Sequence, residues 1–226
     1  MQLTPSACSI LRSETSDLHR TLDTQSVMMC LLDERLTPQI YAAVLRRLLV
    51  CHERLEALLD AFRLVTQPCP AWLSPMVYKR ATSLRADLVG LDEPPVPQKP
   101  RKTSAPIGLV NSRARAAGII YVIAGSSLGA RVISRSVEPR LGALSAACMN
   151  YLRTGQQACL PNWADMRQQL DDELVTSQQI REATDAARDA FRCFIDHLSP
   201  KLMPWEISEP ALPSRRSTMG ALLAAF

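Results

Sequence analysis

The chain has 226 residues, of which 47% are hydrophobic, so it can bury the core of one substantial domain or two small ones. Its net charge of +4 comes from basic residues scattered among acidic ones, which argues against a nucleic-acid groove. The seven cysteines form no CxxC pair and indicate free thiols in a reducing cytoplasm. Residues 1–10 are too polar for a signal peptide, and the longest uncharged apolar run, residues 116–130, is shorter than a membrane span. We therefore expect a cytoplasmic protein that does not enter a membrane.

Helical periodicity runs through most of the chain, and few glycines interrupt it. Thr37 and Pro38 form a start signal for one helix, and Thr176 is a candidate N-cap for the last. The expected helices cover residues 9–30, 38–62, 74–91, 107–137, 162–174 and 176–197, with a further helix starting at Pro139. No strand or repeat is visible. We predict a single all-α bundle of about six to eight helices over residues 1–200, with a Pro-rich loop at 92–106 and a loosely packed or disordered tail at 201–226.

The most informative segment is YVIAGSSLGARV, which begins at Tyr121. Gly125 and Gly129 are four residues apart and so share one face of the expected helix. Because each glycine costs about 1 kcal/mol relative to alanine within a helix, something must approach this backbone closely. The group that approaches the two glycines is either another helix, the commoner case for such a pair, or a planar ligand.

The three histidines carry little meaning one by one. His19 lies on or beside the apolar face of the first helix, where it is either a core histidine bonded to a carbonyl or a ligand of metal or heme iron. His52 has charged neighbours and is expected at the surface or at a helix end. His197 lies at the end of the last helix, where a cation is favoured by the helix dipole.

Three segments together make the chain resemble the heme oxygenase family, in particular its bacterial, biliverdin-producing, bacteriophytochrome-associated branch. They are LRSETSDLH, with Leu, Thr and His at four-residue intervals, YVIAGSSLGARVI, and ATDAARDAFRCF in the last helix. The resemblance covers about residues 10–198. It implies an all-α bundle that holds heme between the first, proximal helix and a central, distal helix.

The resemblance also implies roles for individual residues. His19 corresponds to the ligand of heme iron, and Gly125 and Gly129 would let the distal helix pass close over the heme and confine bound oxygen. Ser126 stands where mammalian members have an aspartate; bacterial members commonly have serine there and rely on ordered water to deliver protons.

Four further residues match heme-contacting positions of the family. Arg12 and Arg167 would pair with the heme propionates, and the alternative for each is an ordinary solvated surface arginine. Phe191 would pack against the heme, and Tyr121 begins the distal segment. For Phe191 a plain core role is the alternative, and both roles are compatible.

The function that the resemblance implies is oxidative cleavage of heme, which is substrate and cofactor at once, to biliverdin, CO and ferrous iron. The reducing equivalents would come from a ferredoxin or a flavin reductase, and a bacteriophytochrome is a candidate receiver of biliverdin. The alternative is a heme-binding sensor or carrier without turnover, in which Ala124 and Ala130, the departures from the family pattern, reflect lost catalysis. A di-iron oxidase lacks its Glu-x-x-His spacing here, and a thiamin-salvage hydrolase lacks a cysteine paired with a base. A bundle that acts only as an interaction module is a further alternative, against which loss of the heme Soret shift in His19→Ala would count.

Overall fold

A computed structural model describes residues 5–94, 107–153 and 163–199, and these form helices without a strand. The all-α prediction is thereby confirmed, whereas the tail at 201–226 and most of the Pro-rich loop lie outside the described residues. The long helices are α1 (Ala7–Asp23), α3 (Pro38–Val65), α6 (Arg113–Leu141) and α10 (Ser177–His197). The shorter elements are α2 (Ser26–Met29), α4 (Pro75–Tyr78), α5 (Ala81–Gly90), α7 (Ser145–Cys148), α9 (Trp163–Glu173) and the 3-10 turns η1 (Cys30–Leu32), η2 (Ala71–Leu73) and η3 (Gly142–Leu144).

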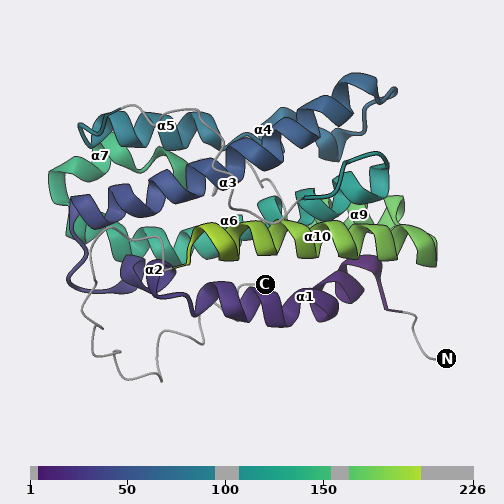
Figure 1. Ribbon diagram of the computed structural model, residues 1–226, viewed down its shortest axis with the longest axis horizontal. Helices are drawn as coiled ribbons and strands as arrows, with labels where there is room; N and C mark the ends of the chain where they lie inside the picture. Colours follow the sequence, from purple (N-terminus) through teal and green to yellow (C-terminus); the bar gives the residue numbers. More distant parts are fainter. Residues whose placement is uncertain (1–4, 95–106, 154–162, 200–226) are drawn as a thin grey trace.

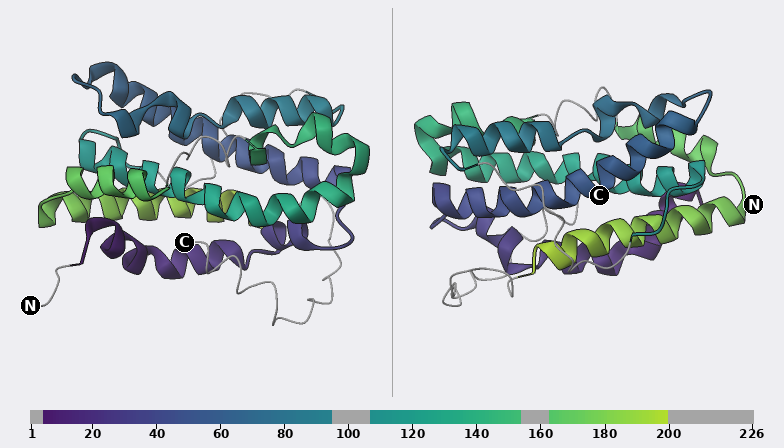
Figure 2. Two further views of the ribbon diagram at one scale, coloured as in Figure 1. Left: turned by 180° about the vertical axis from the view of Figure 1, so that it is seen from behind. Right: turned by 45° about the horizontal axis from the view of Figure 1, so that its top comes forward.

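The helices stack in layers around α10 and α6, which run side by side through the middle of the molecule (Figures 1 and 2). Helix α1 packs along one side of this pair, and α3 covers the other side. Helices α5 and α7 form an outer layer beyond α3. Four helices from distant parts of the chain, α1, α3, α6 and α10, therefore meet at the centre.

Two of the predicted helix starts are confirmed by their hydrogen bonds. The Thr37 hydroxyl accepts from the backbone N–H of Ile40 at 3.3 Å, directly before Pro38 at the first helical position. Thr176 and Gln179 form a capping box, in which each side chain accepts a backbone N–H from the other residue, at 3.2 and 2.9 Å. Local residues alone satisfy these helix ends, which is why the sequence predicts them.

The predicted continuous helix over 9–30 is wrong, because α1 ends at Asp23 and the chain restarts as α2 and η1. Its end is Thr24, whose hydroxyl donates to the carbonyls of Arg20 and Thr21 at 2.9 and 3.2 Å. A hydroxyl that bonds the preceding turn competes with helical continuation.

The predicted helix over 74–91 is also wrong, because it is divided into α4 and α5. The buried carboxylate of Glu56 on α3 accepts the backbone N–H groups of Arg80 and Ala81, at 2.6 and 2.7 Å. A side chain from another helix therefore satisfies the first donors of α5, and no local pattern reveals that partner.

Helix α6 differs from its prediction at both ends. It begins at Arg113 rather than 107, because the Ser112 hydroxyl caps it by accepting from the N–H of Arg115 at 3.2 Å. It then continues through Pro139 to Leu141 instead of ending before that proline. Pro139 stands in the last turn, just before the cap at Gly142, so its missing N–H removes one bond near an end rather than splitting a long helix.

Length and apolar composition alone would allow the segment Arg113–Cys148, which contains α6, to cross a membrane. In the structure 78% of its most apolar window is buried inside the bundle. A helix that is apolar on all sides is also the pattern of a central core helix. The other long helices therefore supply the apolar surroundings of α6.

Helices α6 and α10 pack closely at Gly118. A Cβ atom at this position would lie 2.0 Å from the carbonyl oxygen of Ala183 on α10, too close for any side chain. The packing of the two helices thus uses a glycine that lies three residues, less than one turn, before the segment singled out in the sequence. The close helix–helix contact belongs to Gly118.

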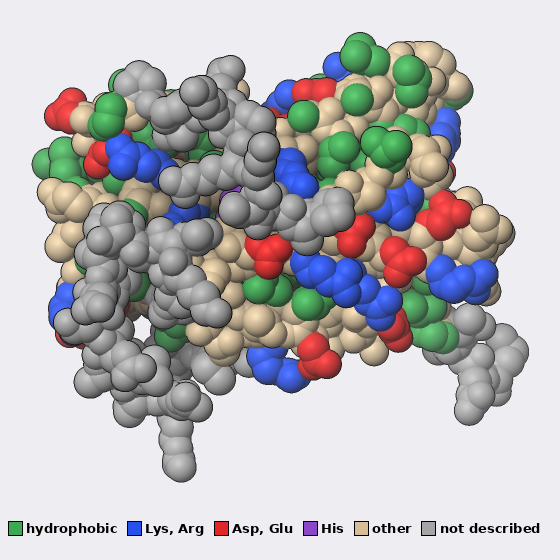
Figure 3. Space-filling view, viewed as in Figure 1, with side chains coloured by type: hydrophobic (Ala, Val, Ile, Leu, Met, Phe, Trp, Pro, Cys, Tyr) green, Lys and Arg blue, Asp and Glu red, His purple; other side chains and the backbone are tan. Residues whose placement is uncertain are grey.

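Charged side chains of both signs are interspersed on the face over α1 and α10 (Figure 3). Arg188 on α10 pairs with Glu14 on α1 at 2.6 Å, and Arg115 on α6 pairs with Asp189 on α10 at 3.4 Å. Such partly exposed pairs contribute at most about 1 kcal/mol each. Apolar burial holds the helices together, and these pairs help to orient them.

Candidate functional site

The main pocket lies where α1, α3, α6 and α10 meet. It contains about 960 Å³ of empty space, counting the space open to solvent at its mouth. Its walls are mostly apolar: Leu22, Met28, Leu31, Leu32, Leu45, Leu48, Val122, Ala130, Ile133, Leu152, Phe191, Phe194 and Leu198. The polar lining side chains are His19, Asp23, Tyr41, Ser126 and Tyr151.

His19 enters this pocket from the last turns of α1. Its Nδ1 lies 2.9 Å from Oδ2 of Asp23, and both side chains are only 13% exposed. The two residues are four apart and therefore lie on one face of the helix. Asp23 fixes which ring nitrogen points away from the carboxylate, the usual role of such a partner behind a metal-binding histidine. The sequence interpretation missed Asp23, although the His-x-x-x-Asp spacing could have revealed it.

Phe191 on α10 packs against His19. The two rings are 5.7 Å apart between centroids and meet edge to face at 73°. Both residues, which the sequence interpretation assigned to one site, line the pocket. This contact from α10 restricts rotation of the imidazole ring.

One face of α6 forms another wall of the pocket. Val122, Ser126, Gly129 and Ile133 follow at steps of four, three and four residues, which keeps them on one side of the helix. Gly129 leaves the backbone bare at this wall. Gly125, one turn earlier, is buried but does not line the pocket.

Ser126 contributes a hydroxyl to this apolar wall. The hydroxyl donates its proton to the carbonyl of Ile123 at 2.7 Å, within its own helix. The oxygen still has lone-pair capacity to accept a hydrogen bond from a group in the pocket. Ser126 can therefore anchor a water or ligand donor as an acceptor.

A buried histidine lies behind the pocket wall. Nε2 of His52 is 3.1 Å from the hydroxyl of Tyr151, and its ring also packs edge to face on Phe194. The expectation that His52 lies at the surface or a helix end is wrong: it is 1% exposed, in the middle of α3. Burial, followed by the nearby charge of Arg80, lowers the pKa of His52 to about 3, so this ring is neutral at pH 7.

Arg12, Arg167 and Tyr121 form a group beside the pocket rather than within its lining. Burial raises the pKa of Tyr121 to about 12, whereas the positive charges of Arg12 and Arg167 act in the opposite direction. Both arginines are exposed, and Tyr121 precedes Val122 of the pocket wall. The two arginines therefore act on Tyr121, and none of the three residues lines the pocket.

The residues of the pocket fit heme. The macrocycle is apolar and flat, its iron takes an imidazole ligand, and its propionates need cations. The pocket offers apolar walls, His19 with a carboxylate behind it, and a bare stretch of α6 at Gly129. The exposed arginines Arg12 and Arg167 are not part of its lining.

The chain was compared with models of known protein families. The model of the heme oxygenase family matches residues 6–199, which is most of the chain. The chain belongs to the heme oxygenase family. The resemblance seen in the sequence is thereby confirmed at the level of the family.

A solved structure of another heme oxygenase has the same fold. It is the NO- and CO-bound heme oxygenase from Neisseria meningitidis, to which this chain is 20% identical, with a TM-score of 0.63. The match covers 86% of this chain and 91% of the other. At this identity the likeness bears on the fold. A search among curated proteins finds no match.

Proposed function

We propose that this heme oxygenase cleaves heme to biliverdin, CO and ferrous iron, and that His19 is its iron ligand. The observation that carries the proposal is the pairing of His19 with Asp23 in an apolar pocket whose α6 wall is bare at Gly129. Heme, once bound, supplies the iron that activates O2 and is itself the molecule that is cleaved. The residues of the chain orient the heme, exclude bulk water from the pocket and deliver protons.

The first task of the chain is to orient the ligand. The carboxylate of Asp23 lies 2.9 Å from Nδ1 of His19, which leaves the other ring nitrogen, Nε2, for the iron. Phe191 limits rotation of the ring. A fixed imidazole places the substrate at one height and angle in the pocket, which is a condition for attack at one position.

The second task is to control access and water on the α6 side. Gly129 allows close approach of backbone, and its neighbours Val122 and Ile133 exclude bulk water. The acceptor lone pairs of Ser126 can hold an ordered water that delivers protons. We assign Gly125 to the close packing of the same helix face, one turn from Gly129.

The third task is to hold the anionic edge of the substrate. Arg12 and Arg167, whose charges both act at Tyr121, are the candidates for binding the propionates. Their exposure allows the propionates to stay near solvent, so no carboxylate needs to be buried.

The finer assignments rest on the resemblance of the sequence segments. We place the protein in the bacteriophytochrome-associated branch and in the cytoplasm, with a ferredoxin or a flavin reductase as electron donor. A bacteriophytochrome is the proposed receiver of biliverdin. Co-purification of the holo-photoreceptor with bound biliverdin from cells that express both proteins tests that partner.

The decisive experiment is heme titration of the purified protein, followed by reduction in air. We expect a Soret band of a histidine-ligated heme, and then its conversion to biliverdin with ascorbate or a reductase in the presence of catalase. His19→Ala should lose that band, and added imidazole should restore it. Thr21→Ala, an exposed change on the same helix, is the matched control. Heme that stays intact under reductant and O2 would leave a heme-binding protein without turnover and refute the enzyme.

A further inference from the structure

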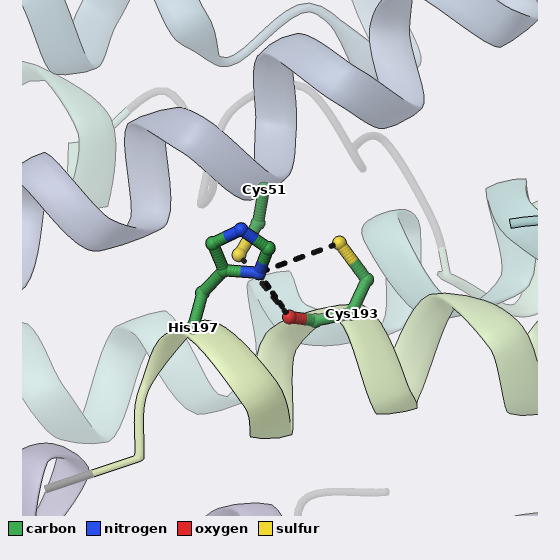
Figure 4. A group of neighbouring side chains, drawn as sticks. All are labelled: Cys51, Cys193 and His197. Atoms are coloured by element: carbon green, nitrogen blue, oxygen red, sulfur yellow. Dashed lines mark hydrogen bonds between the residues drawn. The ribbon is translucent and has the colours of Figure 1, made fainter. Parts of the chain in front are cut away.

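Three potential metal ligands meet between α3 and α10, outside the lining of the heme pocket. They are Cys51, Cys193 and His197, whose ligand atoms all lie within 4.8 Å of one another. Figure 4 shows the Cys51 side chain descending from α3 toward the other two, which rise from α10. Both cysteines are buried, and His197 is half-buried. The sequence interpretation assigned His197 only to the helix dipole and saw no Cys/His cluster.

The hydrogen bonds of the cluster already orient its ligand atoms. Cys51 Sγ donates to the carbonyl oxygen of Cys193 at 3.6 Å, across the interface of the two helices. His197 Nδ1 lies 2.8 Å from that same oxygen and 4.0 Å from the sulfur of Cys193. Two helices thus direct two sulfurs and one imidazole toward a single point.

The end of α10 is also pinned to α3 next to the cluster. Arg47 Nη1 donates to the carbonyl oxygens of His197 and Ser199, at 3.0 and 2.9 Å. Cys193 and His197 are four residues apart and therefore share one face of α10. A rigid frame of this kind is what a bound ion requires of its supporting residues.

Charged and polar neighbours surround the cluster. The neighbouring Cys51 and His197 lower the pKa of Cys193, whereas burial acts in the opposite direction. Burial raises the pKa of Cys51, so its proton must leave when a cation arrives. The charges of Arg54 and Asp196, which have opposite signs, also act on this cluster.

We propose that Cys51, Cys193 and His197 form a binding site for a thiophilic divalent cation of the zinc type, separate from the heme. Two thiolates balance the charge of the dication, so the complex with a neutral imidazole can be buried at low cost. Ideal tetrahedral zinc, with Zn–S bonds of about 2.3 Å, needs sulfurs about 3.8 Å apart. Because the ligand atoms lie within 4.8 Å of one another, they need to close by at most about 1 Å, and a solvent molecule would complete the fourth position.

Binding releases two protons to solvent for each dication, one from Cys51 and one held by Cys193 and its neighbour His197, so that both sulfurs bind as thiolates and the imidazole as a neutral ligand. The contacts that Cys51 and His197 make with the carbonyl of Cys193 are exchanged for the metal. No oxidation or reduction is involved. The ion would tie α3 to α10 beside Leu48, Phe194 and Leu198, which line the heme pocket, and so stiffen one of its walls.

The test uses the heme-free full chain under a non-chelating phosphine reductant. We expect about one equivalent of Zn²⁺ to remain after gel filtration, and Co²⁺ to give thiolate-to-cobalt charge-transfer bands. Cys51→Ser, Cys193→Ser and His197→Gln should each weaken Zn²⁺ binding by roughly 10-fold or more in chelator competition. Cys148→Ser, a buried thiol bonded to the Leu144 carbonyl, and the exposed Cys69→Ser are the matched controls.

Three outcomes would overturn the site. They are wild-type protein without bound Zn²⁺, an equal loss in Cys148→Ser, and a Cys51–Cys193 disulfide that persists under the reductant in place of metal. Folding is controlled by circular dichroism and by thermal melting, in which Zn²⁺ should raise the Tm of the wild type but not of the three ligand variants.

The proposal of the metal site and the proposal of heme cleavage can be refuted independently of each other. His19→Ala should keep its Zn²⁺, because His19 takes no part in this cluster. If Zn²⁺ binding fails while heme turnover persists, the metal site alone is refuted. If heme turnover fails while Zn²⁺ still binds through these three residues, the heme proposal alone is refuted.

Discussion

The two halves of α6 are built on opposite principles. Residues 116–125 are buried one after another, with neighbours on every side of the helix. Beyond Arg131 the buried positions reduce to Ile133, Val137 and Leu141, a single stripe at steps of four residues. One helix is therefore a core element at its beginning and a wall of the bundle toward its end.

Glycine has a different purpose in each half. Gly118 removes a side chain so that the backbone of α10 can approach, and Gly129 removes one at the heme pocket. From the sequence, the pair Gly125 and Gly129 could have faced either another helix or a flat ligand. The structure divides the two roles between two places on the helix. Substitutions in the packed half should damage folding, and those in the pocket half should damage heme binding.

The largest effect is expected for Gly118→Val. Its Cβ would meet backbone atoms of Ala183, which cannot rotate away as a side chain can. We expect a loss of at least about 5 kcal/mol in the free energy of unfolding, comparable to the whole stability of many domains. Urea denaturation monitored by circular dichroism measures it. A stable Gly118→Val protein would break the distinction between the two halves.

Acid sensitivity of the buried His52 is expected to be the next largest effect. Its pKa falls from 6.5 to about 3 on folding, so the unfolded state binds the proton first as the pH drops. The stability that neutral His52 contributes is present above about pH 6.5 and is lost as the pH falls toward 3. The loss amounts to about 3 kcal/mol at pH 4.

His52→Gln is the comparison for this effect, because an amide can still bond Tyr151 without titrating. We expect the variant to lose less stability than the wild type between pH 7 and pH 4 in denaturation experiments. Parallel pH profiles for the two proteins would show that His52 is not buried as the structure has it.

Gly129→Val should affect the pocket and spare the fold. Valine is a better helix former than glycine, so stability should change by less than about 1 kcal/mol. Heme affinity should fall by roughly 10-fold or more, because the branched side chain enters the pocket beside Ala130. Heme titration and thermal melting of one preparation measure both quantities. Unchanged heme affinity would remove Gly129 from the proposed site.

The smallest effect is expected near Tyr121, which lies in the packed half and outside the pocket lining. Arg12→Gln should weaken heme binding by only about 5-fold, because an exposed charge pair contributes about 1 kcal/mol or less. The loss should shrink at high salt. A heme ester that lacks the propionate charges should bind both proteins equally. If the variant still discriminates between heme and the ester as the wild type does, Arg12 is not a propionate partner.

How far the sequence reached depends on the range of the interactions involved. Helices such as α3 and α10 were predicted because their caps, Thr37 and Thr176, bond to residues three positions away. The division of residues 74–91 was missed because its cause, Glu56, lies on another helix. His52 was misplaced for the same reason, since its charged neighbours in sequence say nothing about Tyr151 and Phe194.

The sequence by itself determined the all-helical class, the family, and the pairing of an early histidine with a glycine-containing helix. These follow from local periodicity and from motifs of a few residues. Only the tertiary structure decided which glycine packs on a helix and which borders the pocket, because that depends on the neighbour across the interface. It alone brought Cys51 to Cys193 and His197, which are separated along the chain by the greater part of the fold. Contacts between distant segments produce no periodic pattern in a sequence. The cluster of Cys51, Cys193 and His197 arises only because α3 packs on α10.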